Sequence, residues 1–229
     1  MSLEAQYRAV YALMYKRGTR DAFEQGKFDR FEGTDDAEAE EIKQVAGLRQ
    51  NIVVQLHADD IGNNWYMPRF PATWTALQVA LGADQPELTM RFTDTDYFEL
   101  RVNDDSDGRA LAAFVDTLRL PNAPWLAELL RYERMIAGHW PDGQSPRVET
   151  FEWDVAGVYD ALVDKQLFPV DETPVPLSLL LHRDEAGVTE VALNRDQARV
   201  MKRLIARENL DDAEPSVVAK CRRVLNQLR

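Results

Sequence analysis

The sequence contains few of the residues that build disulfides, metal centres and nucleophilic sites. Among its 229 residues are one cysteine, Cys221, and three histidines, His57, His139 and His182. A single cysteine excludes an internal disulfide, and the histidines lack the His-x-x-x-His and Glu-x-x-His spacings that bring two ligands to one helix face. We therefore expect no metal ligands, no catalytic residues and no cofactor in this chain.

Long apolar runs and glycine-rich loops are also missing. No apolar stretch approaches the roughly 20 residues that span a bilayer, and the glycines stand alone at turns rather than grouped into a phosphate-binding loop. Residues 3–16 show the pattern of an amphipathic helix, with Glu4 and Arg8, in place of a signal peptide. We therefore expect a cytoplasmic binding protein with no membrane segment.

Positive charge is scarce as well. Lys and Arg number 27 against 39 Asp and Glu, so the formal net charge is −12. Nucleic-acid binders use basic residues to neutralise phosphates, so nucleic acid is not the expected partner. Residues 195–229 differ, because nine basic and five acidic residues give +4 there and −16 elsewhere. A solvated helix face is the favoured explanation of this local excess, and a DNA-binding surface is the alternative.

The pattern of apolar residues changes near residue 140. Before it, apolar residues recur at helical spacing; residues 138–146 are rich in turn formers; after them, the spacing alternates as in strands. We predict an α+β protein with an all-helical domain at 1–140 and a small domain at 141–229. The small domain should contain a three-stranded antiparallel or mixed sheet and helices, with strands at 148–153, 177–182 and 188–193 in the order strand, helix, strand, strand, helix, helix.

The segment 121–137 has the clearest helical pattern. Pro124 suits the first helical position, and large side chains recur every three or four residues from Trp125 to Ile136. We predict that this face is buried. Glu133 lies beside it, so its carboxylate should need a hydrogen-bond partner.

Aromatic residues are dense between residues 65 and 74, where two prolines interrupt the chain. Core packing is the ordinary explanation of such density, and a partner-docking surface is the functional one. The residues predicted to dock a partner are Trp65, Tyr66, Phe70 and Trp74.

Four segments carry a family resemblance: Arg-Phe-Pro-Ala-Thr-Trp at 69–74, Pro-Trp-Leu-Ala-Glu-Leu-Leu-Arg-Tyr-Glu at 124–133, Leu-Leu-His-Arg-Asp-Glu-Ala-Gly at 180–187 and Leu-Asn-Arg-Asp-Gln-Ala at 193–198. In order and spacing they resemble a bacterial family of two-domain partner proteins. Its members accompany multinuclear non-haem iron oxidative enzymes that modify ribosomally made peptides, as in methanobactin biosynthesis and thia-amino-acid pathways. Some relatives have been labelled as DNA-binding regulators, which is the alternative function for this chain.

The resemblance implies a division of roles. The iron and the oxidative chemistry would belong to the partner enzyme, the first domain would dock on that enzyme in a heterodimer, and the second would recruit the leader of a precursor peptide. An exposed sheet edge can accept such a peptide as an added strand. We predict the edge at 188–193 first, through Val188, Glu190 and Ala192, and the edge at 148–153 second, through Val148 and Phe151. An edge covered by the chain's own helices is the structural alternative, and the acidic surface would suit a basic leader.

Overall fold

A computed structural model describes most of the chain from residue 61 onward. The described residues are 61–93, 95, 107–140, 143–165, 167–169 and 173–228, preceded by 35–41 and positions 19, 22, 25, 27 and 44. The helix predicted at 3–16 and His57 lie outside them. None of the described helices is long and apolar enough to cross a membrane.

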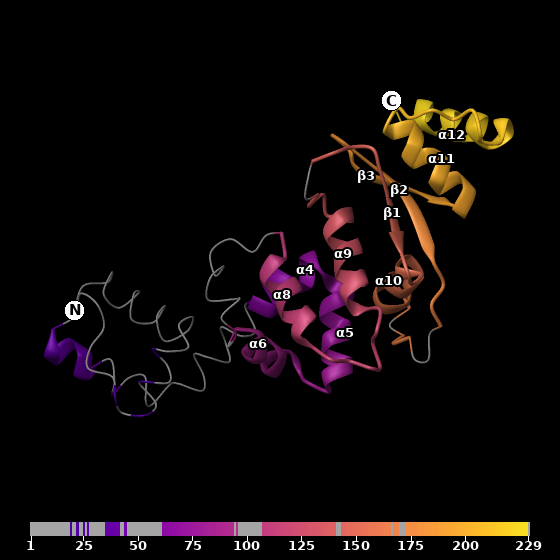
Figure 1. Ribbon diagram of the computed structural model, residues 1–229. Coiled ribbons are helices and arrows are strands. Elements are labelled where there is room, and N and C mark those ends of the chain that lie inside the picture. The colour runs from indigo at the N-terminus through magenta and orange to yellow at the C-terminus, as the bar shows by residue number, and fades with distance from the viewer. Residues whose placement is uncertain are drawn as a thin grey trace. The chain divides into compact units, whose positions relative to one another are not determined.

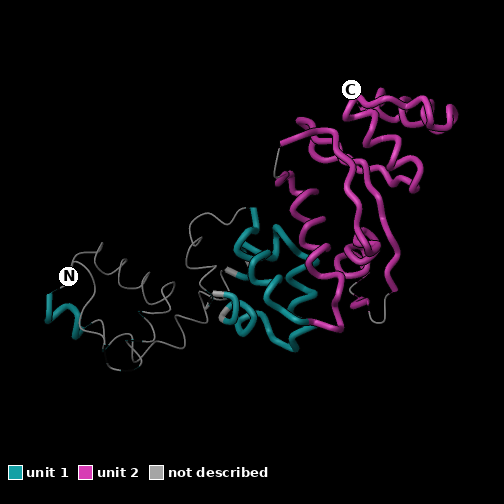
Figure 2. The backbone as a smooth tube through the Cα atoms, in the orientation of Figure 1, with its two compact units in different colours: residues 1–119 teal, residues 120–229 magenta. Residues whose placement is uncertain are grey.

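The chain forms two compact units, residues 1–119 and residues 120–229 (Figure 2). This boundary precedes the one predicted at 140/141, because the helix α9 (Leu126–Ile136) packs within the second unit. Its Tyr132 ring meets the rings of Phe151 and Tyr159 edge-on, with centroids 6.1 and 5.8 Å away. The turn-rich segment 138–146 therefore connects α9 to the sheet inside one unit.

The described part of the first unit is helical and follows local signals in the sequence. It contains η1 (Ile61–Tyr66), α4 (Met67–Arg69), α5 (Pro71–Leu81), α6 (Gln85–Thr93) and α8 (Arg109–Thr117). Pro71 occupies the start of α5, and Gly82 ends it in the left-handed conformation at φ 59°. There the Ala83 N–H donates to the carbonyl of Gln78 at 3.0 Å.

Aromatic rings fill the core of this unit. The Tyr66 ring stacks on Trp74 with centroids 5.2 Å apart and meets Phe92 edge-on at 5.0 Å. Phe70 is fully buried and lies so close to Gly108 that a Cβ there would be 2.6 Å from its ring. Gly108 is therefore required both by this contact and by its φ of 68°.

The second unit contains a three-stranded antiparallel sheet, so the protein is α+β as predicted (Figure 1). Its elements follow the predicted order: β1 (Arg147–Phe151), α10 (Val155–Val163), β2 (Leu177–Asp184), β3 (Gly187–Leu193), α11 (Arg195–Ile205) and α12 (Pro215–Gln227). Of the two predicted arrangements, the sheet is the antiparallel one, with β2 between β1 and β3.

The hairpin between β2 and β3 is tighter than predicted. The five residues between the strands predicted at 177–182 and 188–193 are reduced to a loop of Glu185 and Ala186, because Asp184 and Gly187 already pair across the ladder. The Asp184 carboxylate accepts from the Ala186 N–H at 2.7 Å and stabilises the turn.

Helices contact the sheet from both faces. Val148, Leu180 and Val191, which are neighbours across the three strands, pack with Met201 of α11 and Cys221 of α12. On the other face α9 and α10 pack together, and Tyr132 lies against Phe151. Asn194 caps α11, because its side chain accepts from the Gln197 N–H at 2.9 Å.

Candidate functional site

The hairpin backbone has an inner and an outer side. Asp184 and Gly187 pair across the two-residue loop, and the pair that closes such a loop is hydrogen bonded between the strands. Along an antiparallel ladder, hydrogen-bonded pairs alternate with non-hydrogen-bonded ones. The N–H and C=O groups of Val188, Glu190 and Ala192 therefore point away from β2, toward the outer edge of β3.

This outer edge is open. β3 ends the sheet in the order β1-β2-β3. Within the described part of the chain, no backbone or side-chain group is hydrogen bonded to the outward N–H and C=O groups of β3. Glu190 and Ala192 are exposed, and Val188 is half-buried. Three outward residues are thus ready to donate to and accept from an added strand.

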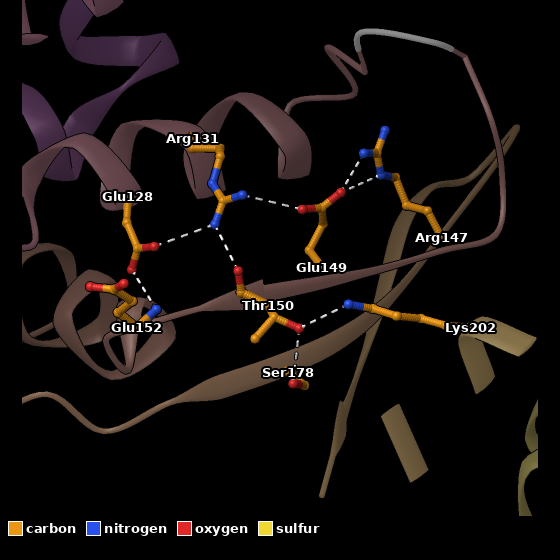
Figure 3. A network of polar contacts seen from close by, with 8 residues as sticks. All are labelled: Glu128, Arg131, Arg147, Glu149, Thr150, Glu152, Ser178 and Lys202. Carbon is orange, nitrogen blue, oxygen red and sulfur yellow. Dashed lines mark hydrogen bonds and ion pairs between the residues drawn. The ribbon is translucent and has the colours of Figure 1, made fainter. Parts of the chain in front are cut away.

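An arginine from α9 occupies one backbone acceptor at the edge of β1. The same alternation, continued through β2, turns the backbone groups of Val148 and Thr150 outward. The Arg131 guanidinium donates through Nη2 to the carbonyl of Thr150 at 2.9 Å, as Figure 3 shows. An edge acceptor that an added strand would need is therefore already occupied.

Charged neighbours hold Arg131 at this edge. Its Nη1 donates to Glu149 at 3.3 Å, and Glu149 also accepts from Arg147 Nε at 2.7 Å (Figure 3). The guanidinium carbon lies 4.4 Å from the centroid of the Phe151 ring. Nη2 of Arg131 also lies 3.5 Å from Glu128. Bonds to three acceptors and an aromatic face restrict the arginine to one arrangement.

One turn earlier on α9, Glu128 closes the end of β1. Its carboxylate accepts from the backbone N–H groups of Glu152 at 2.8 Å and Trp153 at 3.2 Å. On the α11 face, the Thr150 hydroxyl is 3.2 Å from the Ser178 hydroxyl and accepts from Lys202 at 3.3 Å (Figure 3). Side chains from α9 and α11 thus surround the last residues of β1.

At β3, the same helix α9 binds a side chain and leaves the backbone free. The Tyr132 hydroxyl lies 3.0 and 3.2 Å from the two carboxylate oxygens of Glu190 and can donate its single proton to one of them. Burial, and next the charge of Glu190, raise the pKa of Tyr132 far above its ordinary value. Tyr132 therefore stays neutral and keeps donating.

Other carboxylates gather on this side of the unit. Burial raises the pKa of Tyr159, and the negative charges of Glu133, Asp164, Asp160 and Glu190 raise it further. Glu133 is 1% exposed, although the helical pattern placed it only beside the buried face of α9. These carboxylates thus lie near Tyr159, whereas Arg131 and Arg147 lie at the β1 edge.

The predicted peptide-binding residues separate into two groups. Val188, Glu190 and Ala192 share the open edge, as the prediction for 188–193 requires. Val148 packs against the apolar cluster under α11, and Phe151 is 1% exposed beneath Arg131 and Tyr132. At the second-choice edge the Thr150 carbonyl is already bonded to Arg131, a contact that the strand pattern does not reveal.

The predicted docking residues are mostly in the core. Tyr66, Phe70 and Trp74 are each at most 2% exposed and pack within the first unit, so the docking prediction is wrong for their side chains. Trp65 is 36% exposed, with the Arg69 guanidinium 5.5 Å from its ring centroid. Of the four aromatic residues, Trp65 alone has a substantially exposed side chain.

The sequence also failed to indicate a serine–histidine contact. The Ser145 hydroxyl lies 3.2 Å from His182 Nδ1 and accepts from the Arg183 N–H at 2.9 Å. It lies 3.3 Å from the Arg183 carbonyl as well. These contacts tie the segment before β1 to the end of β2, which is a structural role.

The basic residues of α11 and α12 are partly neutralised. Arg203 pairs with Asp212 at 2.7 Å, and Arg199 pairs with Asp196 at 3.5 Å. Arg222 and Arg223 are exposed, and neither forms an ion pair with any described acid. The local positive excess is therefore smaller at the surface than the residue count suggests.

Neither the chemistry of the described residues nor similarity to known proteins identifies an activity. Among those residues, no group of three or more His, Cys, Asp and Glu is placed to hold a metal ion. No protein-family model and no curated protein matches the chain. The open edge of β3, with Glu190 held by Tyr132, is therefore the candidate site.

Proposed function

We propose that this chain is a non-catalytic, cytoplasmic partner subunit of a multinuclear non-haem iron oxidative enzyme. In this role it captures the leader of a ribosomally made precursor peptide on β3 and presents the peptide to the enzyme. The iron and the oxidative step belong to the enzyme.

The open edge of β3 is the observation that carries this proposal. Backbone bonds to Val188, Glu190 and Ala192 would provide affinity for any extended peptide, and side-chain contacts would provide selectivity. The contact of Arg131 with the Thr150 carbonyl at the β1 edge supports β3 as the strand to which the peptide would add. The resemblance of four segments to partner proteins of peptide-modifying enzymes supports the same role.

Peptide capture is tested with the full chain and the labelled precursor encoded beside its gene. Ala192→Pro removes an outward N–H, so the dissociation constant should rise by about tenfold or more. Ala192→Gly is the matched control, because it keeps the N–H and should leave the affinity nearly unchanged. Equal affinities of both variants and the wild type would contradict the proposal.

Enzyme docking is tested at the first unit. Trp65→Ala should weaken co-purification with the iron enzyme, since exposed indoles are frequent anchors at interfaces. Val79→Ala changes another exposed apolar side chain of this unit and should have little effect. Metal analysis should find iron in the enzyme and no stoichiometric metal in this chain alone; about one tightly bound ion per chain would contradict the non-catalytic role.

The basic residues of α12 support a second candidate, a DNA-binding regulator. Arg222 and Arg223 are exposed cations of the kind that contacts phosphates. Reversing both charges should abolish binding of a regulator to the promoter DNA beside its gene, and should leave peptide affinity unchanged. Arg203 is unsuitable for this test, because it holds Asp212 and the loop before α12.

A further inference from the structure

Glu190 is the middle residue of the open edge. It pairs with Leu181, and its outward backbone groups lie between those of Val188 and Ala192. Directly opposite residues in antiparallel strands have Cβ atoms about 5 Å apart, so the residue of an added strand that pairs with Glu190 would meet its carboxylate. The identity of residue 190 therefore affects which peptide can bind.

The carboxylate is positioned before any peptide arrives. Tyr132 holds it at 3.0 and 3.2 Å, and Tyr132 is itself fixed by ring contacts to Phe151 and Tyr159. A single hydroxyl proton leaves most of the lone pairs of the carboxylate unused. The exposed Glu190 can thus accept further bonds from a cation without first giving up the tyrosine.

Among the described residues, Glu190 has no cationic partner. In the described residues it forms no ion pair. Arg183 lies two residues along β2 from the partner of Glu190, but its guanidinium donates to the carbonyl of Gly138 at 2.7 Å. Three further carboxylates, those of Glu133, Asp160 and Asp164, lie near enough to Tyr159 to raise its pKa. A ligand that carries positive charge is therefore complementary to this edge.

A second copy of the chain would fit this edge poorly. β3 runs from Gly187 to Leu193, so two copies paired antiparallel about the strand centre would place one Glu190 opposite the other. Like charges in directly opposite positions destabilise strand pairing. The same residue that suits a cationic peptide thus opposes self-association of the edge.

We propose that Glu190, positioned by Tyr132, selects precursor peptides that carry Lys or Arg at the residue pairing with it in the added strand. The inference rests on the proposed capture of a peptide at β3 and assigns its selectivity to one side chain. It defines the substrate class as extended peptides with a cation on the α9 face of the sheet.

The experiment uses short synthetic peptides of alternating threonine and valine with a central lysine, glutamine or glutamate. The full-length protein should bind the lysine peptide about tenfold more tightly than the glutamate peptide, because the pair changes from attractive to repulsive. Glu190→Lys should reverse this order, and Glu190→Gln should nearly abolish the preference. Glu185→Lys makes the same charge change in the hairpin loop and should preserve the wild-type order.

The outcomes separate selectivity from capture. One outcome is that the peptides bind the wild type, that Ala192→Pro weakens the binding of all of them, and that Glu190→Lys leaves their order of affinity unchanged. In that case capture stands and the selectivity proposal is overturned. If no peptide binds the wild type, both proposals are overturned. A concentration-dependent dimer in sedimentation that Ala192→Pro removes would assign the edge to a second copy and would also overturn the selectivity proposal.

Discussion

The two edges of the sheet are served by the same helix in opposite ways. From α9, Arg131 reaches β1 and binds the backbone carbonyl of Thr150, whereas Tyr132, the next residue, reaches β3 and binds the side chain of Glu190. The first contact occupies a group that an added strand needs. The second leaves every outward backbone group of β3 unoccupied within the described part of the chain.

This difference shows that the solvent exposure of an edge strand and the availability of its backbone groups for an added strand are separate properties. Thr150 and Ala192 are both exposed edge residues. Only at Thr150 does a guanidinium satisfy the outward carbonyl, and an acceptor that is already bonded gains little from a new donor. An open edge is a hazard for aggregation, so a protein that retains one requires a ligand for it or a charge to protect it. Glu190 supplies the protecting charge, and the same charge would attract the proposed cationic ligand.

Proline substitutions at two adjacent positions of β3 should distinguish its inner backbone groups from its outer ones. Of the three predictions, this one should show the largest change in the free energy of unfolding. The Val191 N–H faces Leu180 in the ladder, so Val191→Pro should lower the free energy of unfolding by about 3 kcal/mol. The Ala192 N–H faces outward, so Ala192→Pro should cost about 1 kcal/mol or less. Urea unfolding followed by circular dichroism measures both. Similar losses in the two variants would mean that the edge of β3 is covered.

Opening the edge of β1 should have a smaller effect. Arg131→Met keeps an apolar stem against Phe151 but leaves the Thr150 carbonyl and Glu149 without the guanidinium. Because the Arg131 side chain is 40% exposed, solvent compensates in part, and we expect a loss of about 1–2 kcal/mol in the free energy of unfolding.

Lys202→Met is the control for Arg131→Met. Lys202 is exposed and binds the Thr150 hydroxyl rather than its carbonyl, so its loss should cost less than about 0.5 kcal/mol. If both variants unfold at the same urea concentration as the wild type, Arg131 does not close the edge.

Removing the contact at the β3 side chain should have the smallest effect near neutral pH. Tyr132→Phe should cost about 1 kcal/mol, since Glu190 is exposed and regains water. At alkaline pH the contribution of Tyr132 to the free energy of unfolding decreases and then becomes unfavourable. Because the pKa of Tyr132 is raised in the folded protein, its stabilising contribution is complete below the unfolded-state pKa of about 10 and is lost as the pH rises above it.

The Tyr132→Phe variant should therefore lose less stability than the wild type between neutral pH and about pH 11. Urea midpoints measured across this range test the slope. Tyr159→Phe is the comparison variant, because the pKa of Tyr159 is raised as well and its removal should flatten the same range. Parallel slopes for all three proteins would show that neither tyrosine is held neutral by the fold.

Local residue chemistry accounts for the part of the fold that the sequence predicted. The strands at 148–153, 177–182 and 188–193 overlap β1, β2 and β3, because alternation at strand spacing is a property of consecutive residues. Capping by Asn194 at the start of α11 and by Gly82 at the end of α5 is local as well, since it depends on a few neighbouring backbone groups. The hairpin is shorter than expected because strand pairing continues to Asp184 and Gly187.

The sequence alone determined the α+β class, the order of elements in the second unit and the candidate strand 188–193, all of which depend on spacing within short segments. Tertiary structure alone decided which edge is open and which aromatic side chains are buried. Tyr132 and Glu190 are 58 residues apart, and Arg131 and Thr150 are 19 apart. Their contacts depend on how α9 packs on the sheet, and no periodicity along the chain encodes that packing. Tyr66, Phe70 and Trp74 became core for the same reason, because burial is set by surrounding elements and not by the aromatic cluster itself.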